Sequence, residues 1–148
     1  MCAYRDYVKT FVNANKGKSD REIVMTAISE CVNMKYGPVN DPFTMVTASS
    51  NPGGNCFAKA KLLQRLLSEC GIKSYLHISY FLNSNGEEEA RHMVNEIILE
   101  GSEYTADPTN SRSLFNWSWD GTRSEYETRF NANVTKNRVD SIDPTSIL

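Results

Sequence analysis

Apolar residues recur at helical spacing in three stretches of the chain. The first stretch, near the N-terminus, holds apolar residues three and four positions apart: Tyr4, Tyr7, Val8, Phe11 and Val12. A second helix is expected to begin at the capping box Ser19–Glu22 and to stop near Gly37-Pro38. A third runs from Cys56 to Cys70, with Gly71 well placed as a left-handed terminator.

Period-two and β-rich stretches follow the third helix. Residues 72–82 and 90–99 are rich in β-branched and aromatic residues, and residues 103–108 form a third short run. The turn-forming sequences SNGEEE and EGS separate them. Helices followed by consecutive antiparallel strands predict an α+β fold.

Two regions lack a clear period. Residues 38–54 contain proline, asparagine, serine and glycine, and we expect an irregular loop, which at that length is more often functional than idle. Residues 113–148 are expected to form either a hairpin about Asp120-Gly121 or an irregular tail. We interpret residues 1–148 as one domain with its core at about 20–112.

Composition narrows the class of protein. The chain has 148 residues, of which 40% are hydrophobic and 23% charged, as in ordinary globular proteins. Its formal net charge of −2, with the charges scattered, gives no basic footprint for nucleic acid, and neither a membrane span nor a signal peptide is apparent. We interpret the four cysteines as reduced. We therefore expect a cytoplasmic protein, or a delivered or secreted effector domain without its own signal.

Cys56 stands out among the candidate chemical groups. Asn55 is a natural N-cap, so Cys56 becomes the first helical residue. A thiolate there faces unpaired backbone amides and the positive end of the helix dipole. Gly53 and Gly54 would allow a substrate backbone to pass close to the sulfur. The alternative is a small buried hydrophobe at the end of a core helix.

A nucleophilic thiol needs a base, and the chain has two histidines. His77 lies in the middle of an apolar strand and is interpreted as a satisfied core or sheet-face residue. His92 begins the second strand, and pairing across the EGS turn brings it within about two residues of Asp107. Asp107 would then orient the imidazole as the third member of a triad. A second Asp-Pro-Thr, at Asp143, is too far along the chain for such pairing.

Together these residues resemble the transglutaminase-like family of papain-like cysteine enzymes. The resemblance rests on GNC at the head of a leucine-rich helix, CGI before a strand, HMVNEI and ADPT, and covers about residues 20–112. It implies a papain-like core with helices packed on an antiparallel sheet and the nucleophile at a helix N-terminus. It also implies a Cys-His-Asp triad of Cys56, His92 and Asp107.

The sequence departs from the family pattern in two places. Val94 occupies a position that is commonly aromatic, although Asn95-Glu96 does match. The family tends to supply an oxyanion donor from a tryptophan or glutamine before the cysteine, and residues 38–55 contain neither. We expect the backbone amide of Cys56 to be one donor, with Asn51 as a candidate for the second.

The expected chemistry is cysteine-dependent acyl transfer at an amide of a protein or peptide, through an acyl-thioester on Cys56. Water or an amine would resolve it, as glutamine deamidation, cross-linking or peptide-bond hydrolysis. No cofactor is expected, and no metal, because no ligand pair has zinc spacing. The partners expected are a protein or peptide substrate, with neither nucleic acid nor membrane. The alternatives are a non-catalytic protein-binding module that retains the fold, and a structural protein whose Trp117–Trp119 segment and long loop form a protein-binding patch.

Overall fold

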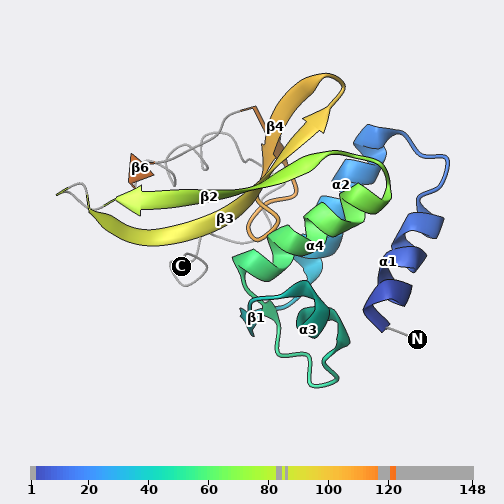
Figure 1. The fold of residues 1–148 in the computed structure, drawn as a ribbon, viewed down its shortest axis with the longest axis horizontal. Helices are drawn as coiled ribbons and strands as arrows, with labels where there is room; N and C mark the ends of the chain where they lie inside the picture. Colours follow the sequence, from blue (N-terminus) through green and yellow to red (C-terminus); the bar gives the residue numbers. More distant parts are fainter. Residues whose placement is uncertain (1–2, 83–84, 86, 117–120, 123–148) are drawn as a thin grey trace.

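The computed structural model describes residues 3–82, 85, 87–116 and 121–122. Four helices are present in this part of the chain (Figure 1): α1 (Ala3–Ala14), α2 (Asp20–Asn33), α3 (Pro42–Thr47) and α4 (Cys56–Glu69). The strands are β1 (Tyr36–Val39), β2 (Ser74–Leu82), β3 (Glu88–Leu99), β4 (Ser102–Ala106), β5 (Leu114–Phe115) and β6 (Gly121–Thr122). The α+β prediction is confirmed.

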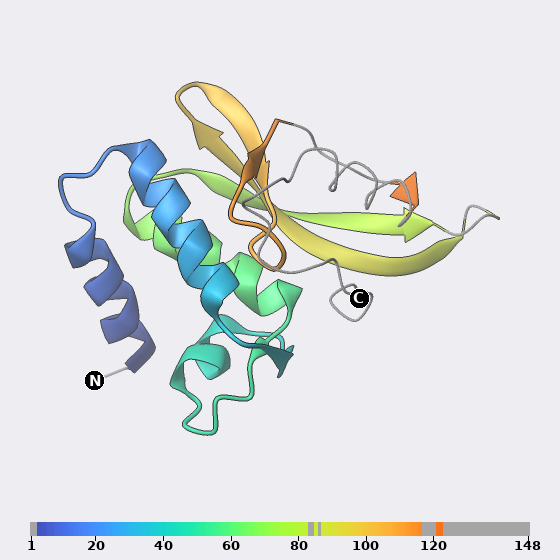
Figure 2. The same ribbon diagram turned by 180° about the vertical axis from the view of Figure 1, so that it is seen from behind.

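The main sheet has the strand order β5-β4-β3-β2-β6. Its first four strands are antiparallel, and β6 pairs with β2 in parallel. Both ribbon views show β2 and β3 as a long curved hairpin that extends past the helices (Figures 1 and 2). The helical layer therefore covers one end of this hairpin, where β3 and β4 also meet.

Helix α4 lies at the centre of the molecule. It packs against α2, against α1 and against the strands β2 and β3. Four leucines in its middle and last turns are completely buried: Leu62, Leu63, Leu66 and Leu67. Burying such side chains is the largest favourable contribution to folding, so the helix that begins at Cys56 is anchored in the core.

Local capping signals confirm the predicted start of α2 and the predicted end of α4. The prediction that the second helix stops near Gly37-Pro38 is wrong, because α2 ends at Asn33 and Tyr36–Val39 forms strand β1. Ser19 forms the expected capping box with Glu22 at the start of α2. Gly71, after α4, has φ +79°, the left-handed conformation that terminates helices. The predicted turn about Gly101 is also present, and Gly101 has the same positive φ.

The prediction of an irregular loop over residues 38–54 is wrong in part. Strand β1 ends and helix α3 lies within this region. Asp41 caps α3 by accepting a hydrogen bond from the Thr44 amide at 2.8 Å, and Pro42 occupies its first turn. A helix of six residues is too short to show a hydrophobic period, which is why pattern analysis missed it.

The predictions for the C-terminal region are tested only at its edge. Strand β5 extends the sheet beside β4, and Gly121–Thr122 pairs with β2. Asp120, the two tryptophans of the WSW segment and residues 131–148 lie outside the described residues.

A buried lysine joins α4 to the end of α2. Lys59, which is 2% exposed, directs its Nζ at the carbonyl oxygens of Val32 and Met34, at 3.4 and 2.7 Å. The last carbonyls of a helix have no intrahelical partner and carry its negative dipole end. The ammonium of Lys59 therefore donates hydrogen bonds to carbonyl groups at the C-terminus of α2. Lys59 itself lies in α4, about one helical turn after Cys56.

Replacing Lys59 with alanine is expected to lower the free energy of unfolding by about 3 kcal/mol, because the change leaves buried carbonyls unpaired and opens a cavity. Urea unfolding followed by circular dichroism measures this. Lys61→Ala is the matched control, since Lys61 lies on the same helix but is exposed, and it is expected to change the free energy by less than about 1 kcal/mol. Equal losses in the two variants would contradict the assigned role.

Candidate active site

Cys56 is the first residue of α4, as predicted. Asn55 is the N-cap, and its Oδ1 accepts a hydrogen bond from the amide of Ala58 at 3.1 Å. The amide of Asn55 is itself held by the carbonyl oxygen of Val39 at 2.8 Å, which ties the helix start to β1. The position of the thiol is thus set by a capped helix end and by a neighbouring strand.

The two glycines before Cys56 have a packing role. A side chain at Gly54 would meet Met45 Sδ at 2.1 Å. Gly53 has φ +88°, and a side chain there would meet the backbone of Tyr36 at 2.7 Å. The space beside these glycines is filled by the protein itself, so the expectation that they leave a passage for a substrate backbone is wrong. They instead let the loop pack tightly before the helix.

His92 lies within β3, and Asp107 directly follows the last residue of the neighbouring strand β4. The β3–β4 register pairs Asn95 with Ala106, so one further step brings Asp107 within two residues of His92, as expected. The His92 Nε2 atom and the Asp107 Oδ2 atom are 2.8 Å apart. Both side chains are buried, at 0% and 1% exposure. This pairing leaves the Nδ1 atom of His92 as the nitrogen available to exchange a proton with a thiol.

Cys56 lies beside this pair. It is completely buried and packs with Ala60 and Met93, the residue next to His92. Burial by itself lowers the pKa of His92, but Asp107, and after it Cys56, act in the opposite direction through charge and hydrogen bonding and raise this pKa to about 10. The raised pKa favours the imidazolium form of His92 at neutral pH, beside the Cys56 side chain.

The carboxylate of Asp107 is held by the turn that follows it. The amide of Thr109 donates to Oδ1 at 3.1 Å, and the side-chain amide of Asn110 donates to Oδ2 at 3.1 Å. The Asp107 carbonyl accepts from the amides of Asn110 and Ser111. The sequence alone assigned the site to Asp-Pro-Thr and did not include Asn110. An asparagine three residues after an aspartate in a turn can indicate a side chain that hydrogen-bonds within that turn.

Asn95 connects the histidine strand to the cysteine helix. Its side-chain amide donates to the Ala60 carbonyl at 2.8 Å, and the residue is completely buried. Ala60 lies one turn after Cys56, and Asn95 lies three residues after His92. This hydrogen bond therefore joins the two elements that carry the thiol and the imidazole. The family pattern contains this asparagine, but the sequence alone assigned it no role.

Two further residues from the sequence analysis, Asn51 and His77, are not among the contacts described for Cys56, His92 and Asp107. Asn51 is exposed, has φ +49° and lines a surface pocket with Tyr7 and Asn33, among other residues. No contact described for it reaches the thiol, and its role as an oxyanion donor stays a prediction. His77 faces Glu96, with 3.6 Å between Nδ1 and Oε1, and is partly exposed, in line with a residue on a sheet face.

The residues described contain no group of three histidine, cysteine or acidic side chains that would hold a metal ion. Nor do they include a helix long and apolar enough to cross a membrane.

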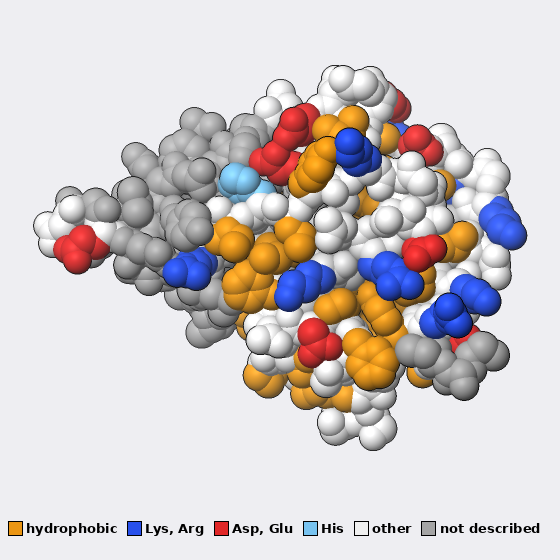
Figure 3. All heavy atoms as spheres, viewed as in Figure 1, with side chains coloured by type: hydrophobic (Ala, Val, Ile, Leu, Met, Phe, Trp, Pro, Cys, Tyr) orange, Lys and Arg blue, Asp and Glu red, His pale blue; other side chains and the backbone are white. Residues whose placement is uncertain are grey.

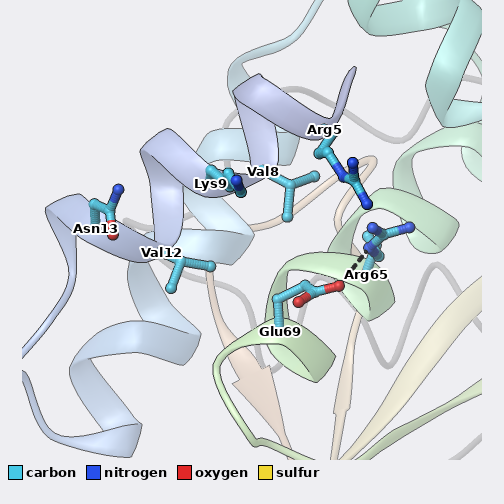
Figure 4. A pocket seen from close by; sticks show the side chains of 7 residues that line it. All are labelled: Arg5, Val8, Lys9, Val12, Asn13, Arg65 and Glu69. Atoms are coloured by element: carbon cyan, nitrogen blue, oxygen red, sulfur yellow. Dashed lines mark hydrogen bonds and ion pairs between the residues drawn. The ribbon is translucent and has the colours of Figure 1, made fainter. Parts of the chain in front are cut away.

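The face shown in Figure 3 carries basic side chains interspersed with acidic and hydrophobic ones. A pocket of about 290 Å³ lies between α1 and α4, where Arg65 pairs with Glu69 (Figure 4), and none of the three candidate residues lines it.

Comparison with known proteins identifies the family. Residues 43–117, just over half of the chain, match the N-acetyltransferase family. The chain belongs to this family. The matched segment contains all three candidate residues and runs from α3 to the end of β5, whereas α1, α2 and β1 precede it. No curated protein matches the chain.

A solved structure agrees with the fold of this N-acetyltransferase family member. It is described as the crystal structure of a TGase, and it aligns with a TM-score of 0.55 at 15% sequence identity. The alignment covers 72% of this chain and 31% of the other, so the chain spans about a third of the length of that structure. The resemblance to the transglutaminase-like fold is confirmed.

Proposed function

We propose that the protein is a cysteine-dependent acyltransferase that carries an acyl group as a thioester on Cys56 and passes it to an amine. The observation that supports this most is the contact of a helix-start thiol with a histidine that is hydrogen-bonded to a buried aspartate at 2.8 Å. Membership of the N-acetyltransferase family supports an amine nitrogen as the acceptor.

The reaction would proceed in two halves. The Cys56 sulfur attacks the acyl carbonyl, and the oxyanion that forms is stabilised by backbone amides at the start of α4. Among the hydrogen bonds of the described residues, those at this helix start use the amides of Ala58 and Lys59 and leave that of Cys56 for this purpose. His92 holds the proton of the Cys56 thiol while the sulfur attacks, and it gives this proton to the leaving group. It later takes a proton from the attacking amine as the thioester bond breaks and the Cys56 thiolate leaves.

The identity of the acyl donor separates two versions of this function. In the first, an activated ester or thioester supplies the acyl group and an arylamine, the acceptor associated with the family, receives it. In the second, the donor is a glutamine side chain or a peptide bond of a protein, and water or a lysine resolves the thioester. The family match favours the first version, and the shared fold of the TGase keeps the second as an alternative.

Mass spectrometry of the intact protein tests the proposal. After incubation with an activated acetyl ester, the wild type is expected to gain one acetyl group on Cys56 and to lose it when an aromatic amine is added. Cys56→Ala is expected to gain none, while Cys70→Ala, which removes a partly buried thiol at the opposite end of the same helix, is expected to behave as wild type.

The same measurement separates the alternatives. A glutamine-containing protein that is deamidated, cross-linked or cleaved only by the wild type would support the second version. An acetyl group that appears equally in Cys56→Ala, or a thiol that accepts none from any donor, would contradict the acyltransferase proposal. It would leave the protein-binding module as the better interpretation.

A further inference from the structure

The turn after Asp107 contains a second buried side chain directed at the carboxylate. Asn110 is 3% exposed, and its Nδ2 atom lies 3.1 Å from Asp107 Oδ2. This is the same oxygen that contacts His92 Nε2 at 2.8 Å. The other oxygen, Oδ1, accepts from the backbone amide of Thr109. The turn therefore donates one hydrogen bond to each carboxylate oxygen. Asn110 donates to Oδ2, the oxygen that also contacts the imidazole.

We infer that Asn110 is a positioning residue of the active site, which acts on the reaction by orienting the Asp107 carboxylate toward His92. The inference rests on the proposed function. The Thr109 amide on Oδ1 and the imidazole on Oδ2 give each carboxylate oxygen one partner. Asn110 adds a donor to Oδ2 that does not depend on the position of the imidazole, so it holds the carboxylate plane independently of His92. Because hydrogen bonds to a buried charge are stronger than those between neutral groups, this contact also favours the ionised form of Asp107 that the imidazolium needs.

Thr109 provides a matched control in the same turn. It is 5% exposed, and its Oγ1 atom is buried without a hydrogen-bond partner among the described residues. Its link to Asp107 comes from the backbone amide, which a change of side chain retains. Thr109→Val therefore perturbs the packing of the turn without removing a donor from the carboxylate.

The experiment measures the rate at which iodoacetamide alkylates Cys56, resolved from the other cysteines by peptide mass mapping. Asn110→Ala is expected to slow this rate about tenfold near pH 7, the effect of one lost charge-assisted hydrogen bond. Thr109→Val is expected to change it less than about twofold, because it leaves that bond intact. Far-UV circular dichroism and thermal melts report whether each variant is folded.

A second variant distinguishes positioning from packing. Asn110→Asp has the same shape but places a second carboxyl group beside Asp107, and such a pair raises the pKa of one member. When that group is protonated, it donates to Asp107 as the amide does. The alkylation rate of Asn110→Asp relative to wild type is therefore expected to rise as the pH falls from about 8 to about 5. A packing defect would give a ratio independent of pH.

The outcomes separate the inference from the function on which it rests. If wild-type Cys56 reacts no faster than Cys70, both the proposed function and the role of Asn110 are wrong. If Cys56 is reactive in the wild type but Asn110→Ala reacts equally fast, or Thr109→Val is slowed as much as Asn110→Ala, only the positioning role is overturned. The same holds for a pH-independent ratio in Asn110→Asp.

Discussion

Replacing Asp107 with asparagine is expected to slow acylation of Cys56 by roughly a thousandfold or more, as when the carboxylate of a catalytic triad is replaced by an amide. The amide has one acceptor oxygen, whereas the site presents donors on both sides: the Thr109 amide at Oδ1, and Asn110 at Oδ2. Whichever way the amide is turned, its NH₂ group meets a buried donor. His92 loses its charge partner and its orientation together.

The acetyl-ester reaction followed by intact mass measures this effect. Glu100→Gln is the matched control, because it makes the same carboxylate-to-amide change in an exposed ion pair with Arg21 and is expected to leave the rate unchanged. A thermal melt identifies loss of folding. Folded Asp107→Asn protein that is acylated at the wild-type rate would show that Asp107 has no part in the reaction.

Raising the pH from about 6.5 to about 10 is expected to destabilise the protein through His92. Its pKa is about 10 in the folded state and about 6.5 in an unfolded chain. Between these values the folded state holds a proton that the unfolded state has released, so the free energy of unfolding falls with pH. The contribution is fully present below about pH 6.5 and is lost as the pH rises through about 10, with a slope approaching 1.4 kcal/mol per pH unit.

Urea unfolding at a series of pH values measures this slope. His92→Gln is expected to flatten it, whereas His77→Gln, which removes the partly exposed histidine of β2, is expected to keep it. A wild-type free energy of unfolding that rises over the same interval would have the wrong sign for a stabilised imidazolium. It would indicate that His92 is neutral in the folded protein.

The candidate triad was within reach of sequence reasoning because each signal is local. Asn55 before Cys56 marks a helix start, and the EGS turn between two β-rich stretches sets the pairing of β3 with β4 to within two residues. The short helix α3 was missed because six residues carry no period. Asn110 and Asn95 were missed as functional residues because an asparagine in a turn or a strand is ordinary until its partner is known.

The sequence by itself determined the starts of α2 and α4, the end of α4, the succession of β2, β3 and β4 and the identity of the chemical groups, because these depend on residues within a turn or a hairpin of one another. Only the tertiary structure decided that Cys56 lies beside His92 and that Asn95 ties the two elements together through Ala60, 35 residues away. It also showed that Gly53 and Gly54 serve packing. Such contacts depend on the position and angle at which α4 packs on the sheet, and the packing of the whole core sets that arrangement.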